Sequence, residues 1–348
     1  MKFRSSRIQS PGIKTRVETS SSTRRYSIIS LYSGCGGMDL GFVGGFKYKG
    51  QSIPRLPFDV IAAYDIDEYC AETYISNIGT QYHTVDLARA KTNKLPKADV
   101  LIGGFPCQEF SICGPRRGIS AERGKLYRSL VNYAKNHKPM VIVAENVSHI
   151  LRLNGGKDLK KVLADFRDVG YKMYTWKMYA PDYGIPQTRD RVFLVGIRRD
   201  LRGKPSIPAP RYLSRHRNIE WAIGDLVNVH NESIPNQSEF FRAAKAKSGH
   251  GQGDEVSKRD LPGYTVRANA KSRVQFHYRR KRRLTIRECA RLQTFPDDFV
   301  FSHPPTNTIM QIGNAVPPLL ANKVAKRIAN FLCSHIKHKV PKRKRRKN

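Results

Sequence analysis

The sequence predicts an α/β fold with a doubly wound sheet, and three junctions between a strand and a turn carry that prediction. An apolar run over residues 26–31 leads into a glycine-rich turn and an amphipathic segment, which is how a βα unit begins. A second apolar run, residues 58–64, ends at Asp65 and precedes a helical segment over 67–77. A third ends in two glycines and a proline at residues 103–106. In such a sheet, ligands bind beyond the carboxyl ends of the strands.

The remaining elements continue this alternation and then change in character. The expected order is a short strand over 83–85, a helix over 127–136, a strand over 140–144, a helix over 158–169, a hairpin-like pair through 171–179 and a strand over 192–197. After residue 198 the sequence predicts a proline-rich linker at 205–210, a short helix over 218–226, a glycine-rich loop at 248–253 and a β-rich stretch over 264–278. A final amphipathic helix over 318–333 is expected to pack back on the first domain.

The charge of the chain predicts a polyanionic partner. Among 348 residues, 63 Lys and Arg stand against 28 Asp and Glu, which gives a formal net charge of +35. The alternative is that this charge only keeps the chain soluble. Clustering at 279–283 and 342–347 favours the polyanion. Residues 1–26 are read as a flexible basic arm and 336–348 as a basic tail that adds nonspecific affinity for such a partner.

Cysteine and histidine usage and hydropathy exclude several classes of protein. The six cysteines form no CxxC pair, which favours a reducing compartment, and the ten histidines show no zinc-binding spacing, so no metal is expected. No apolar run approaches the ~20 residues of a membrane span, and the first residues lack the apolar core of a secretory signal. We therefore expect no membrane partner.

The loop Gly103-Gly104-Phe105-Pro106-Cys107 presents a candidate nucleophile. The glycines allow close approach of a ligand, and Pro106 fixes the direction in which the thiol of Cys107 points. Taken alone, Cys107 would be interpreted first as a small buried apolar residue, and its context must decide. Glu145 follows the strand over 140–144, at the same sheet edge as Cys107, where its carboxyl can hold or donate a proton. A helix N-terminal acid is the alternative for Glu145.

A third group of polar side chains follows residue 183. In an extended chain, Gln187, Arg189 and Arg191 fall on one face because side chains alternate. Three donors on one face suit a phosphate, a carboxylate or a base edge. A solvated strand face is the alternative.

Taken together, these motifs resemble the motif series of the cytosine-C5 DNA methyltransferases. The matching segments are Tyr32-Ser33-Gly34-Cys35-Gly36-Gly37, Gly104-Phe105-Pro106-Cys107-Gln108, Glu145-Asn146-Val147, Gln187-Thr188-Arg189-Asp190-Arg191, residues 283–296 and residues 311–318. They occur in the family's order between about residues 28 and 331. The resemblance implies a Rossmann-like, S-adenosylmethionine-dependent methyltransferase sheet with a smaller target-recognition domain.

The resemblance also assigns the cofactor. It implies that S-adenosylmethionine lies over the glycine turn, with Tyr32 near the adenine, Asp65 on the ribose and Asp86 on the adenine amino group. The full set of implied cofactor residues is Tyr32, Ser33, Gly34, Gly36, Gly37, Asp65, Ile66, Asp86, Leu87, Pro106, Asn314 and Val316. Three positions depart from the family: Tyr32 replaces the usual Phe, Ser30 a frequent Asp, and Asp65 a common Glu.

The implied chemistry is methyl transfer to C5 of a cytosine flipped out of duplex DNA. Cys107 would add to C6, Glu145 would act at ring N3, and Arg189 or Arg191 would anchor the base carbonyl or a phosphate, with Arg191 favoured for the base. The base that removes the C5 proton is not assigned, and a water can serve. The predicted DNA contacts are Gln108, Ser111, Arg116, Arg117, Gln187, Arg267, Lys271 and Arg273.

The expected organisation is a catalytic and cofactor-binding domain at 27–197, a target-recognition domain at 198–283, a hinge at 284–305 and a returning C-terminal helix at 306–335. The segment 114–125 is the candidate for a closing loop. The first interpretation is a monomeric, cytoplasmic and nucleoid-associated prokaryotic enzyme that shares its site with a cognate restriction endonuclease. The alternatives are an enzyme of the same fold acting on transfer RNA, and a non-catalytic DNA-binding relative, which would be expected to lack Cys107 or Glu145.

Overall fold

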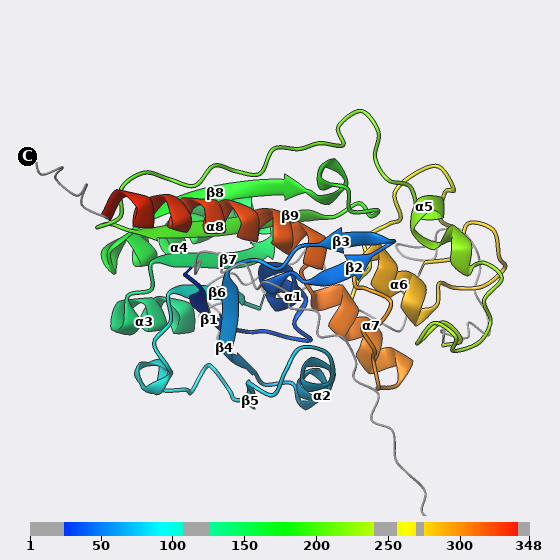
Figure 1. Ribbon diagram of the computed structural model, residues 1–348, viewed down its shortest axis with the longest axis horizontal. Helices are drawn as coiled ribbons and strands as arrows, with labels where there is room; N and C mark the ends of the chain where they lie inside the picture. Colours follow the sequence, from blue (N-terminus) through cyan, green and yellow to red (C-terminus); the bar gives the residue numbers. More distant parts are fainter. Residues whose placement is uncertain (1–23, 107–125, 240–255, 269–274, 340–348) are drawn as a thin grey trace, which may run out of the picture.

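A computed structural model describes residues 24–106, 126–239, 256–268 and 275–339. Within them, one sheet of seven strands carries the predicted α/β fold (Figure 1), in the order β5-β4-β1-β6-β7-β9-β8. Its strands are β1 (Tyr26–Leu31), β4 (Phe58–Asp65), β5 (Tyr82–Thr84), β6 (Val100–Gly104), β7 (Val141–Val147), β8 (Tyr171–Tyr179) and β9 (Asp190–Arg198). Strands β5, β4, β1, β6 and β7 are parallel, and β9 is antiparallel to both β7 and β8.

The predicted hairpin within 171–179 is wrong. These residues form the single strand β8, and its antiparallel partner is β9, from Tyr171 opposite Arg198 to Tyr179 opposite Asp190. The segment contains no Gly, Pro, Asn or Asp that would favour a turn, so its apolar and polar residues continue as one extended run. A small hairpin of β2 (Phe46–Tyr48) and β3 (Gln51–Ile53) was not predicted.

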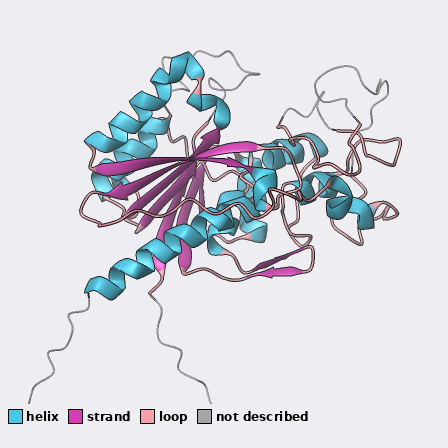
Figure 2. Ribbon diagram, turned by 90° about the horizontal axis from the view of Figure 1, so that it is seen from above, coloured by secondary structure: helices cyan, strands magenta, loops and turns pink. Residues whose placement is uncertain are grey.

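Helices cover both faces of the sheet, as Figure 2 shows, which confirms the doubly wound prediction. The helices are α1 (Gly37–Val43), α2 (Glu68–Asn77), α3 (Tyr127–His137), α4 (Lys157–Asp168), α5 (Ile219–Ile223), α6 (Ile286–Leu292), α7 (Pro305–Asn314) and α8 (Pro318–Lys339). Residues of α1 and α8 form one apolar core with one face of the strands, and residues of α3 and α4 form a second core with the other face. The last helix, α8, thus packs against the strands of the sheet.

The expected C-terminal helix at 306–335 is two helices, α7 and α8, separated at Ala315–Pro317. Two consecutive prolines, Pro317 and Pro318, explain the break, because residues that precede a proline are disfavoured in the α conformation. Pro318 then begins α8, where its fixed φ suits a first helical position.

A second lobe carries α5, α6 and α7 around its own apolar cluster, on the side of the sheet where the parallel strands end (Figure 1). Within the described parts of 256–283, the predicted β-rich stretch forms only isolated bridges, such as Val256 with Phe276 and Phe276 with Arg283. The predicted hinge at 284–305 contains α6, in which every residue is buried. Thr285 and Glu288 close its first turn with a reciprocal capping box. The boundaries of the domains remain predictions.

Candidate active site

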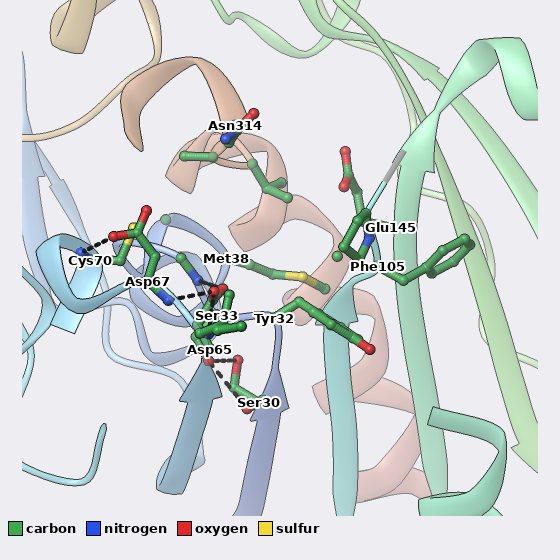
Figure 3. A pocket seen from close by; sticks show the side chains of 18 of the residues that line it. Ser30, Tyr32, Ser33, Met38, Asp65, Asp67, Cys70, Phe105, Glu145 and Asn314 are labelled. Atoms are coloured by element: carbon green, nitrogen blue, oxygen red, sulfur yellow. Dashed lines mark hydrogen bonds between the residues drawn. The ribbon is translucent and has the colours of Figure 1, made fainter. Parts of the chain in front are cut away.

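A pocket of about 620 Å³ opens at the carboxyl ends of β1, β4, β6 and β7. This is the place where open α/β sheets bind ligands, and the volume lies in the ordinary range of small-molecule sites. Figure 3 shows Asp65 and Glu145 on opposite sides of it, with Met38 and Tyr32 between them and Asn314 above. The predicted cofactor residues that line the pocket are Tyr32, Ser33, Gly34, Gly37, Asp65, Ile66, Asp86, Leu87, Pro106, Asn314 and Val316.

The glycine turn leaves its backbone open to a ligand at one position. Gly34 lines the pocket with φ 52°, and no heavy atom lies within 4 Å of the place a Cβ would take. A left-handed φ is the conformation that glycine adopts at least cost. Gly36 does not line the pocket. It is needed for packing, since a Cβ there would lie 2.1 Å from Ile78 Cδ1 and 2.8 Å from Tyr74 Cδ2 on the side of α2.

Asp65, at the end of β4, is held by backbone N–H groups. Its carboxyl oxygens accept hydrogen bonds from Gly34 N at 2.8 Å, Ile66 N at 2.7 Å and Asp67 N at 3.3 Å. Burial raises the pKa of Asp65 above its ordinary value, although these N–H groups act in the opposite direction. The carboxyl therefore ties the glycine turn to β4, and its predicted contact with a ribose stays a prediction.

Glu145 and Arg191 form an ion pair on the opposite side of the pocket. Arg191 Nε donates to Glu145 Oε1 at 2.6 Å, and both side chains are nearly buried. Burial raises the pKa of Glu145, while the guanidinium groups of Arg191 and Arg189 act to lower it. A carboxyl held between these opposing effects is suited to share a proton with a ligand.

Of the three side chains predicted to share a face, Gln187, Arg189 and Arg191, it is Arg191 that lines the pocket. Arg189 is 1% exposed, and its Nη atoms donate to the carbonyl oxygens of Val266, Gly313 and Ala315 at 2.8–3.0 Å. These three carbonyl acceptors hold the guanidinium inside the protein, and the contact with a phosphate or base predicted for Arg189 stays a prediction.

Gln187 is also an interior residue. It is fully buried, its Nε2 donates to the Leu292 carbonyl at 2.8 Å, and its Oε1 accepts from Val266 N at 3.1 Å. Its polar atoms are therefore occupied inside the protein, and the DNA contact predicted for Gln187 stays a prediction. It joins the start of β9 to the second lobe.

Several predicted residues lie outside the described part of the chain. These are Cys107, Gln108, Ser111, Arg116, Arg117, Lys271 and Arg273. The candidate closing loop, the glycine-rich loop at 248–253, most of the basic arm and most of the basic tail also lie outside it. Arg267 is described and is half-buried. It packs closely against α7, since a Cβ at Gly313 would lie only 2.4 Å from the backbone carbonyl carbon of Arg267. Its contact with DNA stays a prediction.

Several residues that line the pocket were not among the site residues predicted from the sequence. They are Ser30, Met38, Asp39, Asp67, Cys70, Phe105, Asn146, Met310 and Gln311. Asn146 is the most informative, because its Nδ2 donates to the Phe105 carbonyl at 3.2 Å and so fastens the chain two residues before Cys107. Its position directly after Glu145 was the signal available in the sequence.

No group of three or more His, Cys, Asp or Glu side chains in the described ranges is placed to hold a metal ion. Among the helices that the structure describes, none has the length and apolar character needed to cross a membrane.

Comparison with known proteins agrees with this geometry. Residues 26–330 match the family described as C-5 cytosine-specific DNA methylase. The type II methyltransferase M.NgoFVII of Neisseria gonorrhoeae is 32% identical over 338 residues, which cover 88% of this chain and 87% of that protein. M.FnuDI of Fusobacterium nucleatum is 32% identical over 353 residues, covering 92% and 98%. The crystal structure of the Dnmt2 methyltransferase of S. pombe superposes with a TM-score of 0.65 at 20% identity, covering 88% of this chain and 98% of that one.

The sheet order and the pocket at its carboxyl edge define the fold class of the C5-methyltransferases. The match over most of the length shows that the chain belongs to the C-5 cytosine-specific DNA methylase family. It is an enzyme, a DNA (cytosine-5-)-methyltransferase, and this family uses S-adenosylmethionine as its methyl donor.

Proposed function

We propose that this enzyme methylates C5 of a cytosine flipped out of a short, specific duplex DNA site, through a covalent adduct between Cys107 and C6. The relatives named type II methyltransferases support a role beside a cognate restriction endonuclease, from which methylation protects the host DNA. We further propose that it acts as a monomer on the DNA of a prokaryotic cytoplasm.

The pocket fits S-adenosylmethionine by the chemistry of its lining. Gly34 offers open backbone, and Asp65 and Asp86 offer carboxylate acceptors at successive strand ends for the hydroxyl and amino groups of a nucleoside. Exposed Ile66 and Met310 add apolar surface at the rim. When bound, the cofactor supplies a methyl group activated as a sulfonium.

The protein's own residues prepare the cytosine. The thiolate of Cys107 forms a bond to C6, which makes C5 nucleophilic, while Glu145 holds a proton at ring N3 and Arg191 binds the base. C5 then takes the methyl group. A base, which can be water, removes the C5 proton, and the electron pair restores the ring as the bond to the thiolate breaks.

The Glu145–Arg191 pair carries this proposal, because it faces the same pocket as the glycine turn, and Glu145 lies on β7 opposite Gly104, the last residue of the strand that leads to Cys107. A non-catalytic relative would have no need to keep a buried carboxyl beside the cofactor pocket.

Transfer of labelled methyl from S-adenosylmethionine to duplex DNA and to transfer RNA tests the proposal. We expect label in DNA for the wild type, none for Cys107→Ala, and a loss of at least ~100-fold for Glu145→Gln, the range of general acid–base catalysis. Label in RNA alone would favour the branch of the family that acts on RNA. Unchanged transfer by Cys107→Ala would contradict the covalent mechanism.

A further inference from the structure

Tyr32 has an unusual backbone conformation at the centre of the pocket. Its φ is 59°, in the left-handed region, where a bulky side chain is a genuine outlier. Such strain persists only where the surroundings impose it, and it concentrates at functional sites. The next residue, Ser33, is held in place on β4, since Ser33 N donates to the Tyr64 carbonyl at 3.1 Å and Tyr64 N donates to Ser33 Oγ at 3.1 Å.

The strained backbone places the ring of Tyr32 in the pocket wall and its hydroxyl against α3. The hydroxyl donates to the carbonyl oxygen of Leu126 at 2.9 Å and lies 2.9 Å from Ser129 Oγ. Ser129 Oγ also lies 2.8 Å from the same carbonyl. Burial raises the pKa of Tyr32 to about 12, so the hydroxyl remains a donor at neutral pH. A phenylalanine at this position could not form these bonds.

Leu126 is a notable partner because of its place in the chain. It also lines the pocket, and it precedes the first residue of α3. On the other side of Cys107, Asn146 donates to the carbonyl of Phe105. Side chains of the pocket thus hold the chain both before and after the cysteine: Asn146 at Phe105, and Tyr32 at Leu126.

We propose that the hydroxyl of Tyr32 is a positioning group that transmits occupancy of the cofactor pocket to the beginning of α3. A cofactor that packs against the ring restricts the hydroxyl, and the hydroxyl restricts Leu126 and Ser129. Because coupling between two sites is reciprocal, an ordered start of α3 also favours a bound cofactor. This inference rests on the proposed use of S-adenosylmethionine and adds a role for Tyr32 beyond contact with the adenine.

The matched variants are Tyr32→Phe and Tyr171→Phe. Each removes one hydroxyl that donates to a carbonyl, but Tyr171 donates to Pro139 at 2.8 Å and does not line the pocket. The probe is S-adenosylhomocysteine, the product of the proposed reaction. Its Kd is measured by calorimetry, and hydrogen exchange is followed in amides 126–133 with and without it. Methyl transfer is measured in a single turnover.

In the wild type we expect S-adenosylhomocysteine to slow exchange in amides 126–133. Tyr32→Phe should still bind it, but more weakly because the coupling is reciprocal, should lose the slowing, and should transfer methyl roughly fivefold more slowly, the scale of removing one hydrogen bond. Tyr171→Phe should match the wild type in Kd and in the slowing. Ser129→Ala, which keeps the ring and removes the other hydroxyl, should weaken the slowing and serves if Tyr32→Phe does not fold.

Slowing that persists at wild-type strength in Tyr32→Phe, or that is absent in a wild type that binds the probe, would overturn the inference and leave the proposed function intact. A wild type that binds neither S-adenosylhomocysteine nor S-adenosylmethionine would overturn the proposed function, and the inference with it.

Discussion

At the scale of single residues, burial decides which polar groups face a ligand and which hold the fold. Glu145 and Asp39 both lie in the wall of the pocket, but their partners differ. Glu145 pairs with Arg191, whereas Asp39 accepts hydrogen bonds from Ser30 Oγ and from Tyr74 OH, each at 3.0 Å. With no cation among these partners, burial raises the pKa of Asp39 to about 6.

This carboxyl predicts a pH-dependent stability. The pKa of Asp39 is higher in the folded state than in the unfolded state, where it is about 4, so the folded state binds its proton more tightly. The contribution of this proton to the free energy of unfolding is therefore full below about pH 4 and is lost as the pH rises from about 4 to 6. The free energy of unfolding of the wild type, relative to Asp39→Asn, should fall by about 3 kcal/mol across that window. Urea unfolding at a series of pH values measures it.

Asp59 provides the control of opposite sign. The guanidinium of Arg25, hydrogen-bonded to it, lowers the pKa of Asp59. Relative to Asp59→Asn, the stability of the wild type should therefore rise with pH below about 4, and only weakly because the pair is exposed to solvent. If the free energy of unfolding of the wild type does not fall relative to that of Asp39→Asn between pH 4 and pH 6, the pKa of Asp39 is not raised in the folded state.

Residues also show why part of the site was predictable and part was not. Strand ends are visible in a sequence, so the amino-acid order alone placed Asp65, Asp86 and Glu145 at one sheet edge. It could not place Arg189, because the acceptors of Arg189 are carbonyl groups at residues 266, 313 and 315. Alternation within a strand says which side chains share a direction, but not which distant backbone lies there.

At the scale of elements, α1 and α8 cross closely at a glycine. A Cβ on Gly41 would lie 2.4 Å from the Pro318 carbonyl oxygen and 2.5 Å from Ala321 Cβ. Asn322 Nδ2 also donates to the Gly41 carbonyl at 2.9 Å. The sequence predicted both segments, because their apolar patterns are local, but not their crossing, which depends on residues almost three hundred positions apart.

This crossing reverses the usual effect of replacing a helical glycine. In an open helix Gly→Ala stabilises by about 1 kcal/mol, but here the added methyl meets backbone atoms, so Gly41→Ala should destabilise by ~1–3 kcal/mol. Gly224→Ala is the control, since its nearest neighbour is the flexible Glu220 side chain at 3.2 Å and its backbone is right-handed helical. It should be neutral or stabilising. Thermal unfolding measures the change in Tm for each variant. Equal changes in Tm for Gly41→Ala and Gly224→Ala would contradict the close crossing.

At the scale of the whole molecule, the two lobes are joined by polar contacts as well as by apolar packing. Lys49, in the turn of the small hairpin, pairs across the two lobes with Asp225 at 2.7 Å, and within the second lobe Arg291 of α6 pairs with Asp225 and Asp297 at 2.7 Å. Cys35, from the glycine turn, packs in the apolar cluster of the second lobe. The ordered motifs made the sheet predictable, whereas the described residues of this second lobe form few regular strands or helices, and their packing had no periodic signal to reveal it.

Part of the net charge of +35 lies in the C-terminal tail, where we expect it to strengthen DNA binding without stabilising the fold. Helix α8 ends at Lys339, and six consecutive cations, Lys342 to Lys347, follow it. Removal of residues 340–348 should leave the Tm unchanged, since the apolar residues of α8 that cover the sheet all precede the cut. Each cation that no longer binds a phosphate lowers the slope of log Kd against log salt by about 0.9. DNA binding by the truncated enzyme should therefore depend less on salt, while methyl transfer at saturating DNA stays the same.

Replacing the six cations with glutamine in the full-length chain controls for length. An unchanged slope in both variants would place the salt-dependent contacts elsewhere, and a lower Tm in the truncated enzyme would mean that the tail also stabilises the fold.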